Sequence, residues 1–294
     1  MNAATQKKIL IVTFVALPLL LLIVFTYFPS LLMFYYSVFD WNGLGNMRFV
    51  GVSNYLEVFT NQELFGTLIN SIYYFIGAVV QMAIGLMLAV FLSFKLKGTN
   101  FFKGTLFFPY LINGVAVGLM FVFFFKPDGM LNLILMKIFG AEDTISFLTV
   151  PVLNNTLLAG VSIWRYLGFN LVMFIGAIQS IPGDIYEAAK IDGANEFQVF
   201  LRIIFPMIRN VALLNLILAI KGAVSVFEVP YIMTTGGFGT STFVIETITL
   251  GMKGYPRRVG LASAMCTVLF VIIVVVTLVQ QKAFGEKKEI KEKA

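Results

Sequence analysis

The sequence contains no histidine and a single cysteine, Cys266. A disulfide within the chain needs a second cysteine, and zinc sites and Cys–His or Ser–His catalysis need residues that are missing here. No Gly-Lys dipeptide occurs either, which excludes the phosphate-binding loop of P-loop ATPases. We therefore expect no catalytic site, metal or cofactor in this chain. If the protein uses ATP and Mg²⁺, we expect another chain to hold them.

Charge is also scarce. Only 12% of the residues are charged, whereas 59% are hydrophobic and the mean hydropathy is +0.90. A helix needs about 20 apolar residues to cross a bilayer. Six runs are long enough, with a few charges in the fourth and fifth: Ile9–Phe39, Leu64–Phe94, Gly104–Phe125, Thr144–Gly183, Asn210–Ile245 and Val259–Gln281. The first is too long for the apolar core of a signal peptide, so we expect it to be retained.

These runs predict an all-α polytopic membrane protein with six transmembrane helices, in a single domain over residues 1–294. Three external segments are expected: a loop with a short helix at Asp40–Glu63, a loop at Lys126–Asp143 and a tight turn at Thr234–Gly239. The glycines of the last segment permit positive φ. The alternative, a glycine-rich phosphate cradle, lacks a lysine and a following helix.

Lysine and arginine predict the orientation, because they concentrate on the cytoplasmic side of membrane proteins. With the N-terminus inside, the six external positions are Arg48, Lys126, Lys137, Lys253, Arg257 and Arg258. The thirteen cytoplasmic ones are Lys7, Lys8, Lys95, Lys97, Lys103, Lys190, Arg202, Arg209, Lys282, Lys287, Lys288, Lys291 and Lys293. Both termini, including a charged tail at 282–294, are therefore expected in the cytoplasm. The net charge of +6 follows from this bias and gives no support for nucleic-acid binding.

The most informative segment is the polar stretch EAAKIDGANEFQVFLRIIFP at 187–206, between the fourth and fifth spans. Pro182 and Asp184 open a short helix, and Gly193 stands where a left-handed residue ends it. Asn195 and Gln198 predict a capping box at the start of a second helix. That helix carries one apolar stripe: Phe197, Phe200, Leu201 and Ile204. From these features alone, the segment is either an interfacial hairpin in lipid headgroups or a docking surface for a cytosolic protein.

This segment resembles the EAA loop of membrane subunits of binding-protein-dependent ABC importers, in which EAA is followed by three residues, Gly, nine residues and Ile-x-Leu-Pro. The matching residues are Glu187-Ala188-Ala189, Gly193, Ile203 and Pro206, with Phe205 in place of the leucine. The six spans and the turn Thr235–Phe238 fit the same superfamily. Within it, Phe49–Tyr55 and Gly260–Ala264 are similar to the MalF-like carbohydrate permeases.

The resemblance implies the MetI-like permease fold and a permease subunit of an ATP-driven carbohydrate importer, for oligosaccharides above all, in a bacterial cytoplasmic membrane. The implied partners are a second EAA-type permease, two ABC ATPase subunits that hold ATP and Mg²⁺, an extracytoplasmic sugar-binding protein and membrane lipid, but no nucleic acid. A cytoplasmic loop at 180–208 would couple this chain to the ATPases. The residues implied in coupling are Glu187, Ala188, Ala189, Asp192, Gly193, Phe197 and Pro206.

Three charged residues, Arg165, Lys221 and Glu228, lie within apolar spans, where an unpaired charge costs about 3 kcal/mol. Lys221 and Glu228 are seven residues apart and predict a common helix face with Ser225 between them. Two interpretations stay open: a salt bridge between helices, such as Arg165 with Glu228, or the lining of a watery cavity. The resemblance places a sugar between the fourth and fifth spans. The substrate-path candidates are Trp164, Tyr166, Phe169, Asn170, Lys221, Ser225 and Glu228.

Three other functions stay open: ABC import of another small solute, ion-coupled secondary transport, and a membrane scaffold that recruits a cytosolic partner. Secondary transporters often contain internal repeats and broken helices. Neither is evident in the sequence, which favours the ABC permease.

Overall fold

The computed structural model describes residues 3–93 and 98–284. The expected cytoplasmic positions Lys95 and Lys97 and most of the tail lie outside the described residues. The chain divides into two compact units, one of Met1–Phe65 with Thr247–Val271 and one of Gly66–Glu246 with Ile272–Ala294. The single domain over 1–294 stays a prediction.

Within the described residues, six helical segments are long and apolar enough to cross a membrane, which confirms the expected all-α class and the number of spans. They are Val12–Tyr36, Gln62–Ser93, Gly114–Phe139, Leu153–Gln179, Glu196–Thr234 and Val259–Lys282.

The first unit begins with a long N-terminal helix and contains one small hairpin. Its elements are α1 (Ala3–Leu22), η1 (Ile23–Tyr27), α2 (Phe28–Tyr36), β1 (Phe39–Asp40), β2 (Arg48–Phe49), α3 (Ser53–Thr60), η3 (Thr249–Lys253) and the first half of α15 (Val259–Phe284). Helix α4 (Gln62–Ile69) and helix α14 (Phe243–Ile248) cross the boundary between the units. The short helix expected in the first external segment is thus present as α3.

The sugar-permease-like motifs near residues 49–55 and 260–264 meet in this unit. Asn54 donates hydrogen bonds to the carbonyls of Ser37 and Phe39, at 2.8 and 2.9 Å. The Phe39 carbonyl also occupies the place of a Cβ at Gly260, so a larger residue there must displace backbone. Arg258 donates two hydrogen bonds of 2.6 Å to Glu57. These motifs therefore fix where α3 and α15 meet the hairpin.

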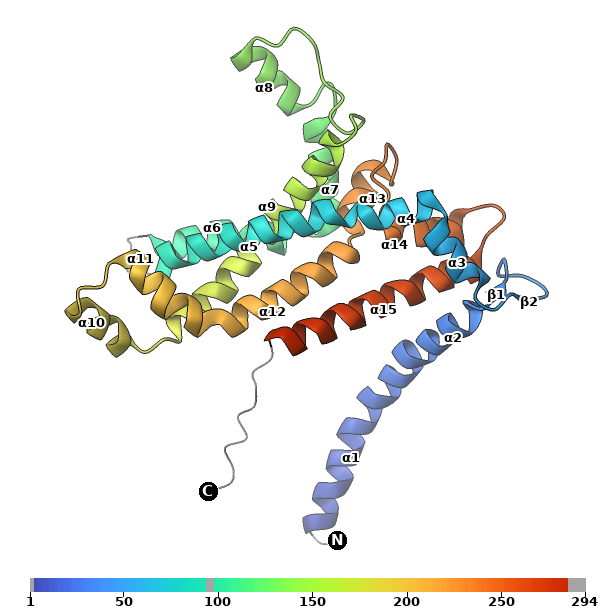
Figure 1. Cartoon of the computed structure of the whole chain (residues 1–294), viewed down its shortest axis with the longest axis horizontal. Coiled ribbons are helices and arrows are strands. Elements are labelled where there is room, and N and C mark those ends of the chain that lie inside the picture. The colour runs from blue at the N-terminus through green and yellow to red at the C-terminus, as the bar shows by residue number, and fades with distance from the viewer. Residues whose placement is uncertain (1–2, 94–97, 285–294) are drawn as a thin grey trace. The chain divides into compact units, whose positions relative to one another are not determined.

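The second unit is built around one well-buried helix, α9 (Leu153–Gln179), which packs against α5 (Ser71–Ser93), α6 (Thr99–Leu111) and α12 (Phe205–Val224) (Figure 1). Its other elements are α7 (Gly114–Phe125), α8 (Met130–Phe139), α10 (Gly183–Ile191), α11 (Glu196–Val199), η2 (Phe200–Ile204) and α13 (Glu228–Thr234). Gly168 of α9 lies against the backbone of Leu106 and Phe107, and Gly85 of α5 lies against Asn170. Small residues at such contacts let membrane helices approach closely.

Two spans of this unit are interrupted, although broken helices were not evident in the sequence. Helix α6 ends at Leu111, just after Pro109, and α7 begins at Gly114 with the Asn113 side chain accepting from the Val115 N–H at 2.9 Å. Helix α12 ends at Val224, and α13 begins at Glu228. The expected third span, Gly104–Phe125, is therefore two helices. The expected loop after it contains α8.

The turn after α13 is held by three asparagines. Asn154 and Asn155, at the start of α9, donate to the carbonyls of Phe238 and Gly239 at 2.8 and 3.1 Å. Asn70 donates to the carbonyls of Gly239 and Ser241 at 3.0 and 2.8 Å. Phe238 keeps a φ of +55° in this turn. The expected tight turn is thus present and is fixed by side chains distant in sequence.

Candidate functional sites

The first candidate site is the polar elbow, residues 180–208, between the fourth and fifth spans. Pro182 precedes the first helical residue of α10, Asp184 lies in its first turn and Lys190 in its last. A carboxylate at the N-terminus and an ammonium at the C-terminus both match the helix dipole. The predicted start of this helix is confirmed.

The turn after α10 is a Schellman motif centred on Gly193. The Ala194 N–H donates to the Ala189 carbonyl at 3.0 Å, and the Gly193 N–H donates to the Lys190 carbonyl at 3.2 Å. Gly193 has a φ of +74°, and no atom lies within 4 Å of the position of a Cβ. The residue is therefore required by its backbone conformation and not by a lack of space. This confirms the predicted glycine C-cap.

The next helix begins with the predicted capping box. The Gln198 N–H donates to Asn195 Oδ1 at 2.8 Å, and the Asn195 N–H donates to Gln198 Oε1 at 2.9 Å. However, no separate second helix follows: α11 continues through the π-helical turn η2 directly into α12. Pro206 has no N–H for the Arg202 carbonyl, and the wider turn, closed by the Phe205 N–H on the Phe200 carbonyl, accommodates this.

The expected apolar stripe of α11 and η2 is divided between two environments. Ile204 is buried, and Phe200 is partly buried beside it, in a cluster with Phe174 and Ile178 of α9. In contrast, Phe197 is 69% exposed and Leu201 is also exposed. Only part of the stripe therefore packs against the membrane helices.

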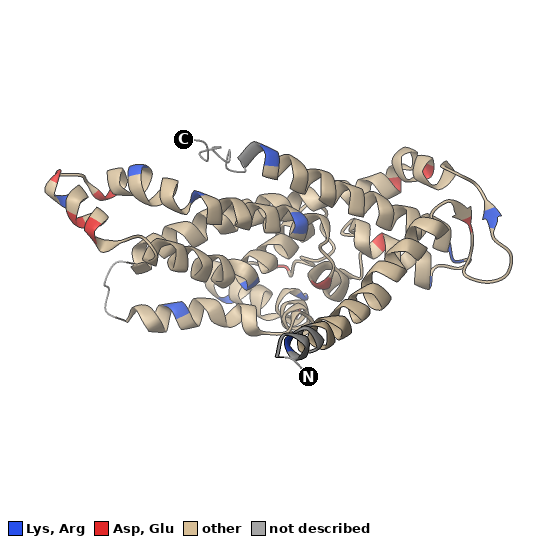
Figure 2. Ribbon diagram, turned by 90° about the horizontal axis from the view of Figure 1, so that it is seen from below, with Lys and Arg blue, Asp and Glu red and all other residues tan. Residues whose placement is uncertain are grey.

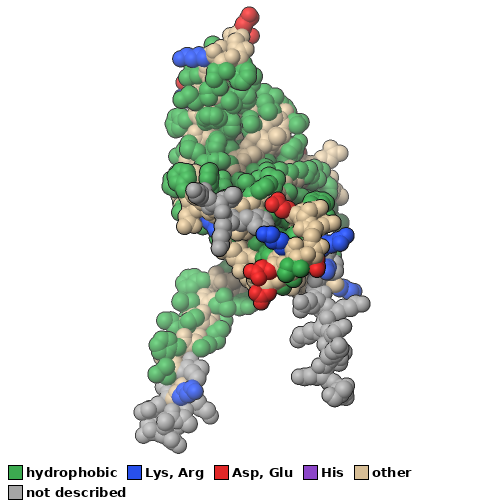
Figure 3. Space-filling model, turned by 90° about the vertical axis from the view of Figure 1, so that its left-hand side faces the viewer, with side chains coloured by type: hydrophobic (Ala, Val, Ile, Leu, Met, Phe, Trp, Pro, Cys, Tyr) green, Lys and Arg blue, Asp and Glu red, His purple; other side chains and the backbone are tan. Residues whose placement is uncertain are grey.

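The exposed face of the elbow is acidic with apolar residues between the charges. Ala189 is buried, whereas Glu187, Ala188 and Asp192 are exposed. Residues 180–208 contain four acidic side chains and two basic ones: Asp184, Glu187, Asp192 and Glu196, and Lys190 and Arg202. Figure 2 shows acidic and basic residues close together at the elbow and single charges spread along the helices, and Figure 3 shows the elbow end facing the viewer. Ile191, 86% exposed, was not singled out from the sequence, although it directly precedes the turn where no helix neighbour covers it.

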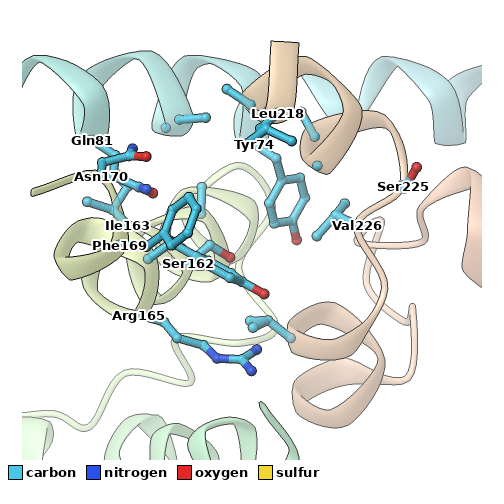
Figure 4. A pocket seen from close by; sticks show the side chains of 18 of the residues that line it. Tyr74, Gln81, Ser162, Ile163, Arg165, Phe169, Asn170, Leu218, Ser225 and Val226 are labelled. Atoms are coloured by element: carbon cyan, nitrogen blue, oxygen red, sulfur yellow. The ribbon is translucent and has the colours of Figure 1, made fainter. Parts of the chain in front are cut away.

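The second candidate site is a cavity of about 600 Å³ inside the second unit, between α5, α9, α12 and the start of α13, with Tyr110 of α6 at its wall. Figure 4 shows Gln81 and Asn170 on one side, Ser225 and Val226 on the opposite side, and Arg165 along a third. Five aromatic residues belong to its lining: Tyr74, Tyr110, Tyr166, Phe169 and Phe227. Three of them form a group, in which the Tyr110 ring lies 5.2 Å from the Phe169 ring and 6.0 Å from the Tyr166 ring between centroids. The cavity therefore combines flat aromatic faces with polar side chains.

Several polar atoms at this cavity are buried and lack a hydrogen-bond partner in the described part of the chain. They include the Tyr74 hydroxyl, both amide atoms of Asn215 and Nε of Arg165. Asn215 is only 2% exposed. An unpartnered buried polar group is costly, so these atoms are suited to bind water or a polar ligand.

The two interrupted spans meet at an ion pair at the edge of the cavity. Arg165 Nη1 of α9 donates to Glu228 Oε2, the first residue of α13, at 2.6 Å. Gly114, the first residue of α7, leaves the space for this pair, because a Cβ there would overlap Glu228 Oε2. The pairing of Arg165 with Glu228, one of the two interpretations left open, is confirmed, and the pair also lines the cavity.

Five of the seven substrate-path candidates line the cavity: Tyr166, Phe169, Asn170, Ser225 and Glu228. Lys221 and Trp164 do not belong to its lining; Lys221 is exposed and Trp164 packs edge-on against Phe121, 5.3 Å between centroids. The predicted common face of Lys221 and Glu228 is wrong, because α12 ends between them. The role of the five lining candidates in a substrate path stays a prediction.

The lining residues that the sequence analysis missed include Tyr74, Gln81, Tyr110 and Asn215. Tyr74, Gly77, Gln81 and Gly85 recur at helical spacing and are all buried on one face of α5. That spacing within an apolar run was the available signal. Asn215 stands alone in its run and gave only the general signal of a polar residue in a span.

Six spans, a polar cavity and a folded polar elbow define a multi-pass membrane protein of the transporter class. The chain belongs to the family of binding-protein-dependent transport system inner membrane components, and the model of this family matches residues 81–289. It is 32% identical to the probable ABC transporter permease protein YurN of Bacillus subtilis, over 97% of this chain and 99% of that protein. It is 30% identical to the multiple sugar-binding transport system permease protein MsmF of Streptococcus mutans, over 92% and 93%.

The fold is also that of a solved ABC transporter. One chain in the crystal structure of a bacterial alginate ABC transporter, in complex with an alginate pentasaccharide-bound periplasmic protein, matches with a TM-score of 0.82. The identity is 20%, and the match covers 94% of each chain. This likeness confirms the expected importer-permease fold.

Proposed function

We propose that this chain is a permease subunit of an ATP-driven carbohydrate importer and that its cavity receives the sugar. The observation that carries the proposal is the cavity itself: aromatic faces from Tyr110, Tyr166 and Phe169 beside unpartnered polar atoms of Tyr74 and Asn215. Hydroxyl-rich ligands need donors and acceptors set among apolar walls, and a volume of about 600 Å³ is in the range of ligand pockets. The sugar-transport name of the Streptococcus mutans relative supports this substrate class.

The elbow at 180–208 is the part that couples the chain to ATP hydrolysis. Its acidic, partly apolar tip suits a cleft with basic residues on an ATPase subunit, with Glu187, Asp192 and Phe197 exposed for contact. Because α11, η2 and α12 form one uninterrupted helical segment, a movement of the tip is carried to α12. Asn215 on α12 lines the cavity. The same helix thus joins the docking surface to the sugar site.

The complete importer contains further chains. A second permease of the same kind completes the path, and an extracytoplasmic binding protein delivers the sugar. Two ATPase subunits, which hold ATP and Mg²⁺, dock at the elbows of the two permeases. This chain itself has no catalytic role. Its place is the cytoplasmic membrane of a bacterium, with both termini inside, as the distribution of lysine and arginine favours.

The test is uptake by the complete importer, in which this chain is co-purified with the second permease and the ATPase subunits and reconstituted into vesicles. ATP is supplied on the cytoplasmic side and the sugar-binding protein on the other side. Labelled sugars of one to five units are offered, beside betaine as a solute that is not a sugar. We expect uptake of at least one sugar that persists when ionophores collapse the ion gradients. Uptake that stops with the gradients would indicate secondary transport, uptake of betaine alone would indicate another solute, and ATPase binding without any uptake would indicate a scaffold.

A further inference from the structure

The charges around the cavity balance. Among its lining residues in the described part of the chain, the charged ones are Arg165 and Glu228, which pair with each other. Lys221, the other cation of this region, is exposed and stands outside the lining. Two cations with one carboxylate in these spans would favour an anionic ligand. The structure leaves one cation and one carboxylate, so the cavity walls carry no net formal charge.

Glu228 is held in place by more than Arg165. Its carboxylate lies against Gly114 at the N-terminus of α7, a helix of 12 residues, and a carboxylate is favoured there by the helix dipole. It is also the first residue of α13, where the same preference applies. The carboxylate is therefore fixed at this edge of the cavity by two helix ends and one guanidinium.

Arg165 is buried, with 11% of its side chain exposed, whereas 53% of the Glu228 side chain is exposed. A carboxylated ligand that reached for the unpartnered Arg165 Nε would have to approach the Glu228 carboxylate at the same time. Like charges brought together in this way weaken binding by roughly 100-fold. A neutral hydroxyl-rich ligand meets no such repulsion and can use the amides and the Tyr74 hydroxyl.

We propose that the cavity selects uncharged sugars and that Glu228 is the residue that determines this selectivity, by neutralising Arg165. This rests on the proposed function, because it names the substrate class of the same cavity. Removing the charge of Glu228 frees Arg165 as a binding group for a uronate. Removing both charges returns the cavity to neutrality.

The experiment measures equilibrium binding of two trisaccharides, neutral maltotriose and anionic trigalacturonate, to the full chain with its co-purified subunits in nanodiscs. The variants are Glu228→Gln, the double variant Arg165→Gln/Glu228→Gln, and Lys221→Gln as a control that removes a nearby charge outside the cavity. We expect the wild type and Lys221→Gln to bind maltotriose roughly 100-fold more tightly than trigalacturonate. Glu228→Gln should narrow this ratio at least tenfold, and the double variant should restore the preference.

Equal binding of both sugars by the wild type would overturn the proposal, as would a ratio that Glu228→Gln leaves unchanged. Both results would leave the proposed function standing, because a sugar is still bound. If Glu228→Gln does not assemble, the wild-type ratio alone decides. Absence of binding of either sugar by all variants would also overturn the selectivity proposal, and the uptake panel would then decide the proposed function separately.

Discussion

The junction of Arg165, Glu228 and Gly114 allows one substitution to be worked out in magnitude. In Gly114→Ala the added Cβ overlaps Glu228 Oε2 and lies 2.5 Å from Arg165 Nη1 and 2.8 Å from the Glu228 carboxyl carbon. Ordinary contacts of this kind are longer than 3 Å, so the carboxylate has to leave its place. Breaking a buried ion pair costs about 3–5 kcal/mol. Because Glu228 is half-exposed and can turn toward the cavity, we expect the lower end of that range.

A gain offsets part of this loss, because alanine is favoured over glycine within a helix by about 1 kcal/mol. The net expectation is a loss of about 2 kcal/mol in the free energy of unfolding, or about 4–8 °C in Tm for a chain of this size. The measurement is thermal unfolding in nanodiscs. Gly104→Ala in α6 is the matched control, since no atom lies within 4 Å of its Cβ.

A double-mutant cycle isolates the cause. In a Glu228→Ala background the carboxylate is gone, so Gly114→Ala should cost at least 1 kcal/mol less than in the wild type. If Gly114→Ala unfolds at the same temperature as Gly104→Ala, or costs as much without Glu228 as with it, the argument from the ion pair is refuted.

Three further predictions concern the elbow, the first unit and the orientation. Gly193→Val should reduce co-purification of the ATPase sharply, because a β-branched residue resists the φ of +74°, whereas Gly193→Asn, which tolerates that conformation, should retain it; equal retention would contradict the role of the turn. The hydrogen bonds from Arg258 hold the pKa of Glu57 below its usual value, so the pair stabilises the fold above about pH 4.3 and this is lost as the pH falls through the lowered pKa. Glu57→Gln should therefore lower the free energy of unfolding by at most about 1 kcal/mol at pH 7 and should not change it at a pH below the lowered pKa of Glu57. Unfolding is measured at both pH values, and a loss of stability that persists in acid would contradict the assignment to this pair. In a Cys266→Ser background, cysteines at positions 97 and 288 should resist an impermeant maleimide added to intact cells, and labelling from outside would reverse the topology.

The sequence was sufficient where structure is local. The Schellman turn at Gly193 and the capping box of Asn195 and Gln198 are each made by residues within six positions of one another, so residue type and spacing determine them. The six spans follow in the same way, because hydropathy over about 20 residues decides membrane insertion.

The rest depends on contacts that spacing does not reveal. Lys221 and Glu228 stand at helical spacing, but the helix between them ends at Val224, where α13 turns to pair with α9 and α7. Pro109 and Asn113 were signals in the sequence for the break before Gly114. That the break makes room for the Glu228 carboxylate is seen only in the structure. A periodic pattern predicts a face only as long as the helix continues.

The central claim is that the elbow binds the ATPase, and it is tested most directly by cross-linking from two exposed positions. Ile191, 86% exposed at the tip of the elbow, and Phe139, 74% exposed at the end of α8, are each replaced by cysteine in a Cys266→Ser chain. A short bifunctional maleimide is then added to the assembled complex in nanodiscs. Our account predicts a cross-linked product of Ile191→Cys with the ATPase subunit, and none for Phe139→Cys. A product from Phe139→Cys, or no product from Ile191→Cys in a complex that still contains the ATPase, would contradict it.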